Sequence, residues 1–153
     1  MLVEDDFEPW RRFSRLTLQA NSRWQVIGEA ADGWAAVQQA QALQPDLIVL
    51  DIGLPTLNGI EVARQIRNLC PNCRILFLTE NYSWEIADAA FEAGASGYVV
   101  KSDAAKDLLP GIMAVLEGAR FVSSRMAGHS LLGTAHRHKA GFYSDDRAFL
   151  DEI

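Results

Sequence analysis

The stretch that decides the fold is LIVLDIGLPTLNG, residues 47–59, with Asp51 at its centre. A short run of apolar, strand-favouring residues, 47–50, leads directly into this carboxylate. The turn-forming residues that follow it are Gly53, Pro55, Asn58 and Gly59. An apolar run bounded by turn residues predicts a buried strand that opens into a loop. Asp51 should therefore stand at the carboxyl end of a strand, where it either caps the next turn or faces a ligand.

The same alternation of apolar runs and helical segments extends over most of the chain. Strands are expected at residues 2–6, 24–30, 46–51, 74–79 and 97–101. Apolar residues recur at helical spacing after each of them, which predicts five helices. In the last helix, Pro110 requires either a regular part that starts near Asp107 or a kink. Apolar strands joined by helices predict a parallel sheet covered on both faces.

Composition limits the class of protein. The chain has 153 residues, of which 49% are hydrophobic and 22% charged, as expected for one globular domain with about 25 residues to spare. Its net charge of −6 argues against direct binding to nucleic acid or to an anionic membrane. Because the sequence has neither a membrane-length apolar run nor a basic segment leading into one, we expect a cytoplasmic protein.

The two cysteines, Cys70 and Cys73, lie in the sequence CPNC. A redox pair needs its first sulfur at the amino terminus of a helix, where the thiol pKa falls. Here the pair follows the helical segment 60–69, at the end where the helix dipole has the wrong sign. An ordinary loop is therefore favoured over a redox or zinc site.

Polar residues end several of the predicted strands. Asp5 or Asp6, Asp51, Thr79 and Lys101 should meet at one edge of the sheet, because the carboxyl ends of parallel strands lie together. Clustered carboxylates need a cation or shifted pKa values, and hard oxygen ligands suit Mg²⁺. A carboxylate can also attack phosphorus, and a metal, a lysine and a hydroxyl suffice for phosphoryl transfer.

Four motifs carry a specific resemblance. They are VEDDF at 3–7, LDIGLPTLNG at 50–59, FLT at 77–79 and GYVVKS at 97–102. Together they resemble the receiver domain of two-component response regulators over residues 1–125. VIGEAADG at 26–33 and FVSS at 121–124 are most similar to the NarL-type subfamily. The resemblance implies a flavodoxin-like α/β fold, a doubly wound five-stranded parallel sheet with strand order 2-1-3-4-5 and five helices.

The resemblance also implies a role for each matching residue. Asp51 would accept a phosphoryl group from a sensor histidine kinase, Thr79 would donate its hydroxyl to a phosphoryl oxygen, and Lys101 would pair with another. Tyr98 would turn inward when Thr79 closes on the phosphate, or else is simply a half-buried strand aromatic. The implied Mg²⁺ ligands are Asp5, Asp6, Asp51 and the carbonyl of Gly53.

The implied function is a phosphorylation switch rather than an enzyme, assisting only its own phosphotransfer and dephosphorylation. Phosphorylation would change the surface of the fourth helix, fifth strand and fifth helix, which would control homodimerisation and output, in transcriptional regulation. One alternative is an interaction module of receiver shape that works without phosphorylation. Another is a phosphatase of the haloacid dehalogenase type, which needs an acid two residues after its nucleophile, where this chain has Gly53.

Two positions depart from the family pattern. Three acids stand in a row, so the metal pair is either Asp5 with Asp6 or Glu4 with Asp5. Counting back from residues 28–30 favours the first pair and leaves Glu4 where an apolar residue is usual. Glu80 follows Thr79 where receivers more often have a small residue, and its charge could slow phosphorylation.

Residues 126–153 fit no part of a receiver. We expect a linker followed by the truncated start of an output or further sensory domain. HRHKAGFYSDD, residues 136–146, weakly resembles the beginning of a sensory domain, and a DNA-binding output is the other possibility.

Overall fold

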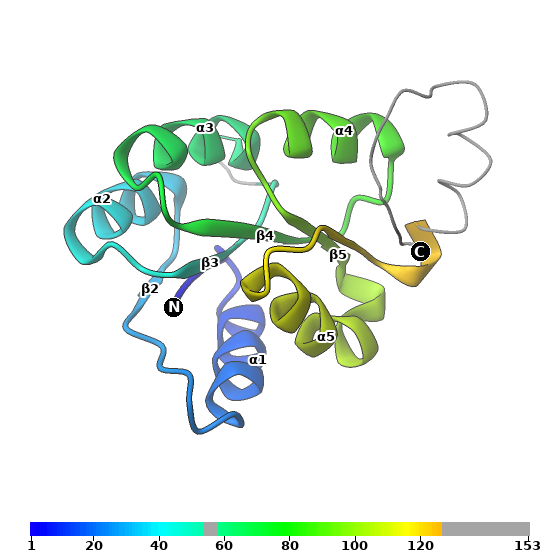
Figure 1. Cartoon of the computed structure of the whole chain (residues 1–153), viewed down its shortest axis with the longest axis horizontal. Helices are drawn as coiled ribbons and strands as arrows, with labels where there is room; N and C mark the ends of the chain where they lie inside the picture. The colour runs from blue at the N-terminus through cyan, green and yellow to red at the C-terminus, as the bar shows by residue number, and fades with distance from the viewer. Residues whose placement is uncertain (54–57, 127–153) are drawn as a thin grey trace.

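The structure, a computed structural model, describes residues 1–53 and 58–126, so the predicted linker and output segment lies outside the described residues from residue 127 onward. Six parallel strands form one sheet in the order β2-β1-β3-β4-β5-β6 (Figure 1). The strands are β1 (Leu2–Glu4), β2 (Gly28–Ala30), β3 (Leu47–Leu50), β4 (Arg74–Thr79), β5 (Gly97–Val100) and β6 (Phe121–Val122). The helices are α1 (Glu8–Gln19), α2 (Gly33–Leu43), α3 (Gly59–Leu69), α4 (Trp84–Glu92) and α5 (Ala104–Leu116), and a 3-10 turn, η1 (Lys101–Asp103), precedes α5.

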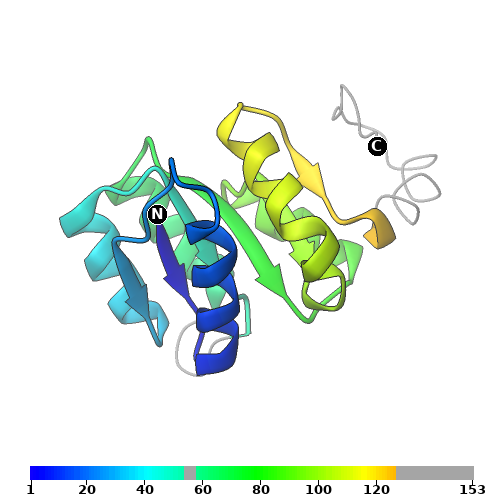
Figure 2. The same cartoon turned by 90° about the horizontal axis from the view of Figure 1, so that it is seen from below.

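Helices cover both faces of this sheet. Helices α2, α3 and α4 lie on one face, and α1 and α5 lie on the other (Figures 1 and 2). Each face has its own apolar core, with Ile48 and Phe77 pointing into the first and Val49 and Leu76 into the second. The predicted doubly wound fold with strand order 2-1-3-4-5 is therefore confirmed, and β6 is added at the outer edge of β5. Within the described ranges, no helix has the length and apolarity needed to cross a membrane.

Short polar side chains start three of the helices. Asp32 accepts a hydrogen bond from the N–H of Ala35 in α2, and Ser83 accepts two from the first turn of α4. Asn58 caps α3 in the same way, and Gly59 follows it. A Cβ at Gly59 would collide with the carbonyl oxygen of Asp51, so only glycine lets α3 begin this close to the end of β3.

The first two strands are shorter than the sequence predicted. Strand β1 ends at Glu4 because the side chain of Asp5 accepts the N–H of Phe7 and turns the chain. Strand β2 covers only Gly28–Ala30 rather than residues 24–30. These are the three residues that face β1 in the sheet, and beyond them residues 24–27 add to this pairing only the hydrogen bonds of Gln25 and Ile27 with Met1.

Pro110 lies inside α5, which begins at Ala104, so the structure excludes one of the two alternatives, a regular part that starts near Asp107. A proline removes the hydrogen bond to the carbonyl four residues earlier, here that of Lys106. Pro110 and Lys106 are both exposed, so water can take the place of the missing donor.

Candidate functional site

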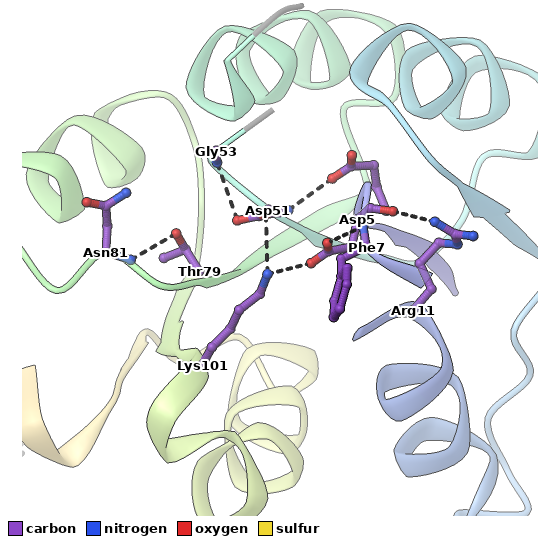
Figure 3. A network of polar contacts seen from close by, with 9 residues as sticks. Asp5, Phe7, Arg11, Asp51, Gly53, Thr79, Asn81 and Lys101 are labelled. Carbon is purple, nitrogen blue, oxygen red and sulfur yellow. Dashed lines mark hydrogen bonds and ion pairs between the residues drawn. The ribbon is translucent and has the colours of Figure 1, made fainter. Parts of the chain in front are cut away.

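A cavity of about 380 Å³ opens at the carboxyl ends of β1, β3, β4 and β5. The predicted site residues Asp5, Asp51, Thr79 and Lys101 surround it and come from four different strands or their ends (Figure 3). Its full lining is Asp5, Asp6, Phe7, Trp10, Asp51, Gly53, Thr79, Glu80, Asn81 and Lys101. The parallel topology thus brings together residues that lie far apart in the sequence.

Lys101 lies between two carboxylates at the base of the cavity. Its Nζ is 2.7 Å from Oδ2 of Asp5 and 3.3 Å from Oδ2 of Asp51, and the three side chains are less than 10% exposed (Figure 3). Burial lowers the pKa of Lys101, but the hydrogen bond to Asp5 and the charge of Asp51 outweigh it and raise this pKa overall. The lysine therefore stays charged at neutral pH and holds the two carboxylates together.

The backbone around Asp51 is fixed from two sides. Its N–H donates to Oε1 of Glu4 at 3.1 Å, and its own Oδ1 accepts the N–H of Gly53 at 3.3 Å. Asp51 directly follows the last residue of β3, is 6% exposed and lines the cavity. If Asp51 only capped the following turn, its bond to Gly53 would be explained but its bond to Lys101 would not.

The acidic cluster fits a hard divalent cation. One carboxylate oxygen from each of Asp5, Asp6 and Asp51 lies within 4.8 Å of the others. This group corresponds to the favoured pair Asp5 and Asp6, while Glu4 is 1% exposed and part of β1. Three carboxylates and a nearby backbone carbonyl are the oxygen donors that Mg²⁺ binds, and Gly53 lines the same cavity.

Glu4 is a buried acid in an otherwise apolar strand. Its Oε1 accepts the Asp51 N–H, and its Oε2 has no hydrogen-bond partner among the described residues. Burial, together with the charges of Asp51, Asp5 and Asp6, raises the pKa of Glu4 to about 8 against the opposing effect of the Asp51 N–H. Glu4 is therefore largely protonated in the folded chain at neutral pH.

This pKa makes the stability of the fold depend on pH. In the unfolded chain Glu4 titrates near 4.5, so between 4.5 and about 8 only the folded state holds the proton. The contribution of Glu4 is thus fully present below 4.5 and is lost as the pH rises through 8, at up to about 1.4 kcal/mol per pH unit. Urea unfolding in EDTA should show a shallower decline between these pH values for Glu4→Gln than for the wild type. Parallel curves would contradict the prediction.

The side chains of Thr79 and Tyr98 meet at Asn81. Oγ1 of Thr79 accepts the N–H of Asn81 at 3.2 Å, and the hydroxyl of Tyr98 donates to the Asn81 carbonyl at 2.9 Å. Tyr98 is fully buried with its ring 6.5 Å from that of Phe91, so a half-buried strand aromatic is not what the structure contains. Burial raises the pKa of Tyr98, so its hydroxyl keeps its proton and remains a donor.

Sequence reasoning missed two residues of the site, Trp10 and Asn81, and it missed the bond between Glu4 and the Asp51 backbone. Trp10 places its ring 5.1 Å from Nζ of Lys101, Asn81 links Thr79 to Tyr98, and Glu4 binds the Asp51 backbone. The available signal was position in the sequence, because Trp10 lies shortly after the acidic triplet and Asn81 lies shortly after Thr79. Glu80 is exposed and lines the cavity, as its position after Thr79 led us to expect.

The two cysteines lie away from this site and behave as loop residues. Both are buried, and the N–H of Cys73 donates to the carbonyl of Cys70 across a tight turn. Burial raises the pKa of the Cys73 thiol, which is the opposite of what a reactive thiol requires.

The chain belongs to the response regulator receiver domain family, whose model matches residues 1–112. It is similar to the DNA-binding transcriptional activator DevR/DosR of Mycobacterium tuberculosis, with 38% identity over 98% of this chain and 71% of that protein. It is 32% identical to the transcriptional regulatory protein LiaR of Bacillus subtilis, over 89% of this chain. A solved structure of a LuxR-family two-component response regulator from Aurantimonas sp. SI85-9A1 is 35% identical, with a TM-score of 0.84, and the match covers 88% of this chain and 96% of that one.

These comparisons confirm the predicted NarL-type receiver of a two-component system. The chain spans 56–64% of the length of three curated relatives that it matches. Statements about these relatives as whole regulators therefore extend beyond the part of the molecule that this chain represents.

Proposed function

We propose that residues 1–125 form a phosphoacceptor domain that takes a phosphoryl group from a sensor histidine kinase onto Asp51. The observation that carries the proposal is the position of Lys101, whose Nζ bonds to both Asp5 and Asp51 in a cavity that Thr79 also lines. An acceptor carboxylate, a cation and a hydroxyl around one opening are the groups that phosphoryl transfer requires.

The transfer is a displacement at phosphorus. A carboxylate oxygen of Asp51 attacks the phosphohistidine, so that a P–O bond forms while the P–N bond breaks. The leaving imidazole nitrogen keeps the electron pair and takes a proton from water. Lys101 and the hydroxyl of Thr79 bind phosphoryl oxygens, and the same groups assist the later hydrolysis of the acyl phosphate by water.

Magnesium is the proposed cofactor, held by Asp5, Asp6, Asp51 and the carbonyl of Gly53. When bound, it neutralises negative charge on the carboxylates and on the transferred group. The clustering of three carboxylate oxygens within 4.8 Å supports this choice, since three ionised carboxylates carry more negative charge than the single cation of Lys101 balances.

Phosphorylation would act on the surface formed by α4, β5 and α5. Thr79 and Tyr98 both bond to Asn81, so a movement of Thr79 toward a phosphoryl oxygen acts on the residue that holds the Tyr98 hydroxyl. We expect the resulting change of this surface to control homodimerisation and output, and the relatives suggest that the output is transcriptional.

Labelling with phosphoramidate in the presence of Mg²⁺ tests the proposal. We expect intact-mass spectrometry to show one added phosphoryl group, peptide mapping to place it on Asp51, and EDTA to suppress it. Absence of label would favour an interaction module that works without phosphorylation. Multiple turnover of p-nitrophenyl phosphate would instead favour a phosphatase, even though Gly53 stands where such enzymes have an acid.

A further inference from the structure

The chain that leaves α5 does not depart from the domain but turns back along β5. Phe121 and Val122 form β6 and pair in parallel with Gly97 and Tyr98 at the outer edge of the sheet (Figure 2). We name residues 121–126 the strap. Three of its six residues are at most 9% exposed: Val122, Ser123 and Met126.

The strap is bonded to each of the three elements of the proposed switching surface. Ser123 donates its N–H to the Tyr98 carbonyl at 3.0 Å and accepts the N–H of Val100 on Oγ at 2.8 Å, which joins the strap to β5. Ser124 joins it to α5, since its N–H donates to Asp107 at 3.1 Å. Nε1 of Trp84 in α4 donates to the Met126 carbonyl at 2.9 Å. The strap thus covers the β5 edge between α4 and α5.

Two short routes connect the strap with the candidate site. The first passes from Thr79 through Asn81 to the Tyr98 hydroxyl, and the Tyr98 carbonyl binds the N–H of Ser123. The second follows the backbone, because Val100, which donates to Ser123 Oγ, directly precedes Lys101. Both routes end on Ser123, which is fully buried.

We propose that residues 121–126 are a docked relay, held more tightly when Asp51 is phosphorylated, which transmits the state of the site to the chain that follows Met126. The proposal rests on the proposed function, since it requires a phosphoryl group on Asp51. That phosphorylation tightens the docking of the strap, rather than loosening it, follows from the hydrogen bonds of Thr79. A hydroxyl that accepts the Asn81 N–H can still donate its own proton to a phosphoryl oxygen, so the bound phosphoryl group reinforces the arrangement in which the strap is docked.

Hydrogen exchange of the whole chain tests the relay, with beryllofluoride and Mg²⁺ as the phosphoryl mimic. We expect the amides of Val100 and Ser123 to exchange about tenfold more slowly in the mimic. This is the change expected when the free energy of local opening rises by about the net contribution of one hydrogen bond. In Ser123→Ala the Val100 N–H loses its acceptor, so this slowing should disappear while phosphoramidate still labels Asp51. Ser123→Thr keeps the hydroxyl and should restore the response, which separates the relay from a general loss of folding.

Ser124→Ala is the matched control. It removes a neighbouring serine hydroxyl that bonds to Asp107 on α5, outside both routes, and should respond to the mimic like the wild type. Labelling of Asp51 with unchanged exchange of Val100 and Ser123 in the wild type would overturn the relay and leave the proposed function standing. Absence of labelling would overturn the proposed function first. An equal loss of response in Ser124→Ala and Ser123→Ala would overturn the routing through Ser123.

Discussion

Asp51→Asn should take up phosphoryl groups more than about 100-fold more slowly than the wild type, because an amide is a far weaker nucleophile toward phosphorus than a carboxylate. The fold should persist, because the amide keeps an oxygen that can accept a hydrogen bond from Lys101. The substitution also removes one negative charge from a group of carboxylates that repel one another. Rates of labelling by phosphoramidate in Mg²⁺, followed by intact mass, measure the effect.

The exposed Asp6 supplies the matched control. Asp6→Asn removes one carboxylate of the cluster but leaves Asp51 and its contacts with Lys101 and Glu4 in place. We expect this variant to be labelled on Asp51 at saturating Mg²⁺ and to need a higher Mg²⁺ concentration than the wild type. Labelling of Asp51→Asn at the wild-type rate would show that the acceptor is another residue.

The second large effect concerns stability. Lys101→Met keeps the apolar stem but leaves the carboxylates of Asp5 and Asp51, 4% and 9% exposed, without their shared cation. Removing one partner of a buried ion pair typically costs about 3–5 kcal/mol, and we expect a loss of that size in the free energy of unfolding. Urea titration in EDTA measures it without a divalent ion that could take over the charge of the lysine.

Arg64→Met is the comparison for Lys101→Met. Arg64 pairs with Glu61 on the surface of α3 at 3.1 Å, with both side chains more than 40% exposed. Exposed pairs of this kind contribute about 0–1 kcal/mol, so the variant should unfold close to the wild type. Equal losses in the two variants would mean that the lysine does not balance the buried acids.

Thr79 and Lys101 could be assigned to the cavity from sequence because each directly follows or ends an apolar run. In a parallel sheet every such run ends at the same edge, so the topology converts four distant positions into one cluster. The acidic triplet could not be resolved in this way. Which of the three acids face the cavity depends on where β1 ends, and the hydrogen bond from the Phe7 N–H to Asp5 ends the strand at Glu4.

The strap escaped sequence analysis for a related reason. A two-residue strand has no detectable period, and FVSS contains no turn signal that would distinguish a docked segment from a linker. The bonds from Ser123 to Tyr98 and Val100 join residues more than twenty positions apart. Such contacts depend on the packing of α5, which positions the returning chain beside β5.

By itself the sequence determined the doubly wound parallel fold and the placement of Asp51, Thr79 and Lys101 at one edge of the sheet. Local patterns suffice for this because apolar periodicity and turn residues fix where each strand ends. Only the tertiary structure decided that Glu4 is buried against the Asp51 backbone, that Asn81 joins Thr79 to Tyr98, and that residues 121–126 close the β5 edge. These features depend on hydrogen bonds between distant segments, whose geometry exists only once the sheet and its helices have packed.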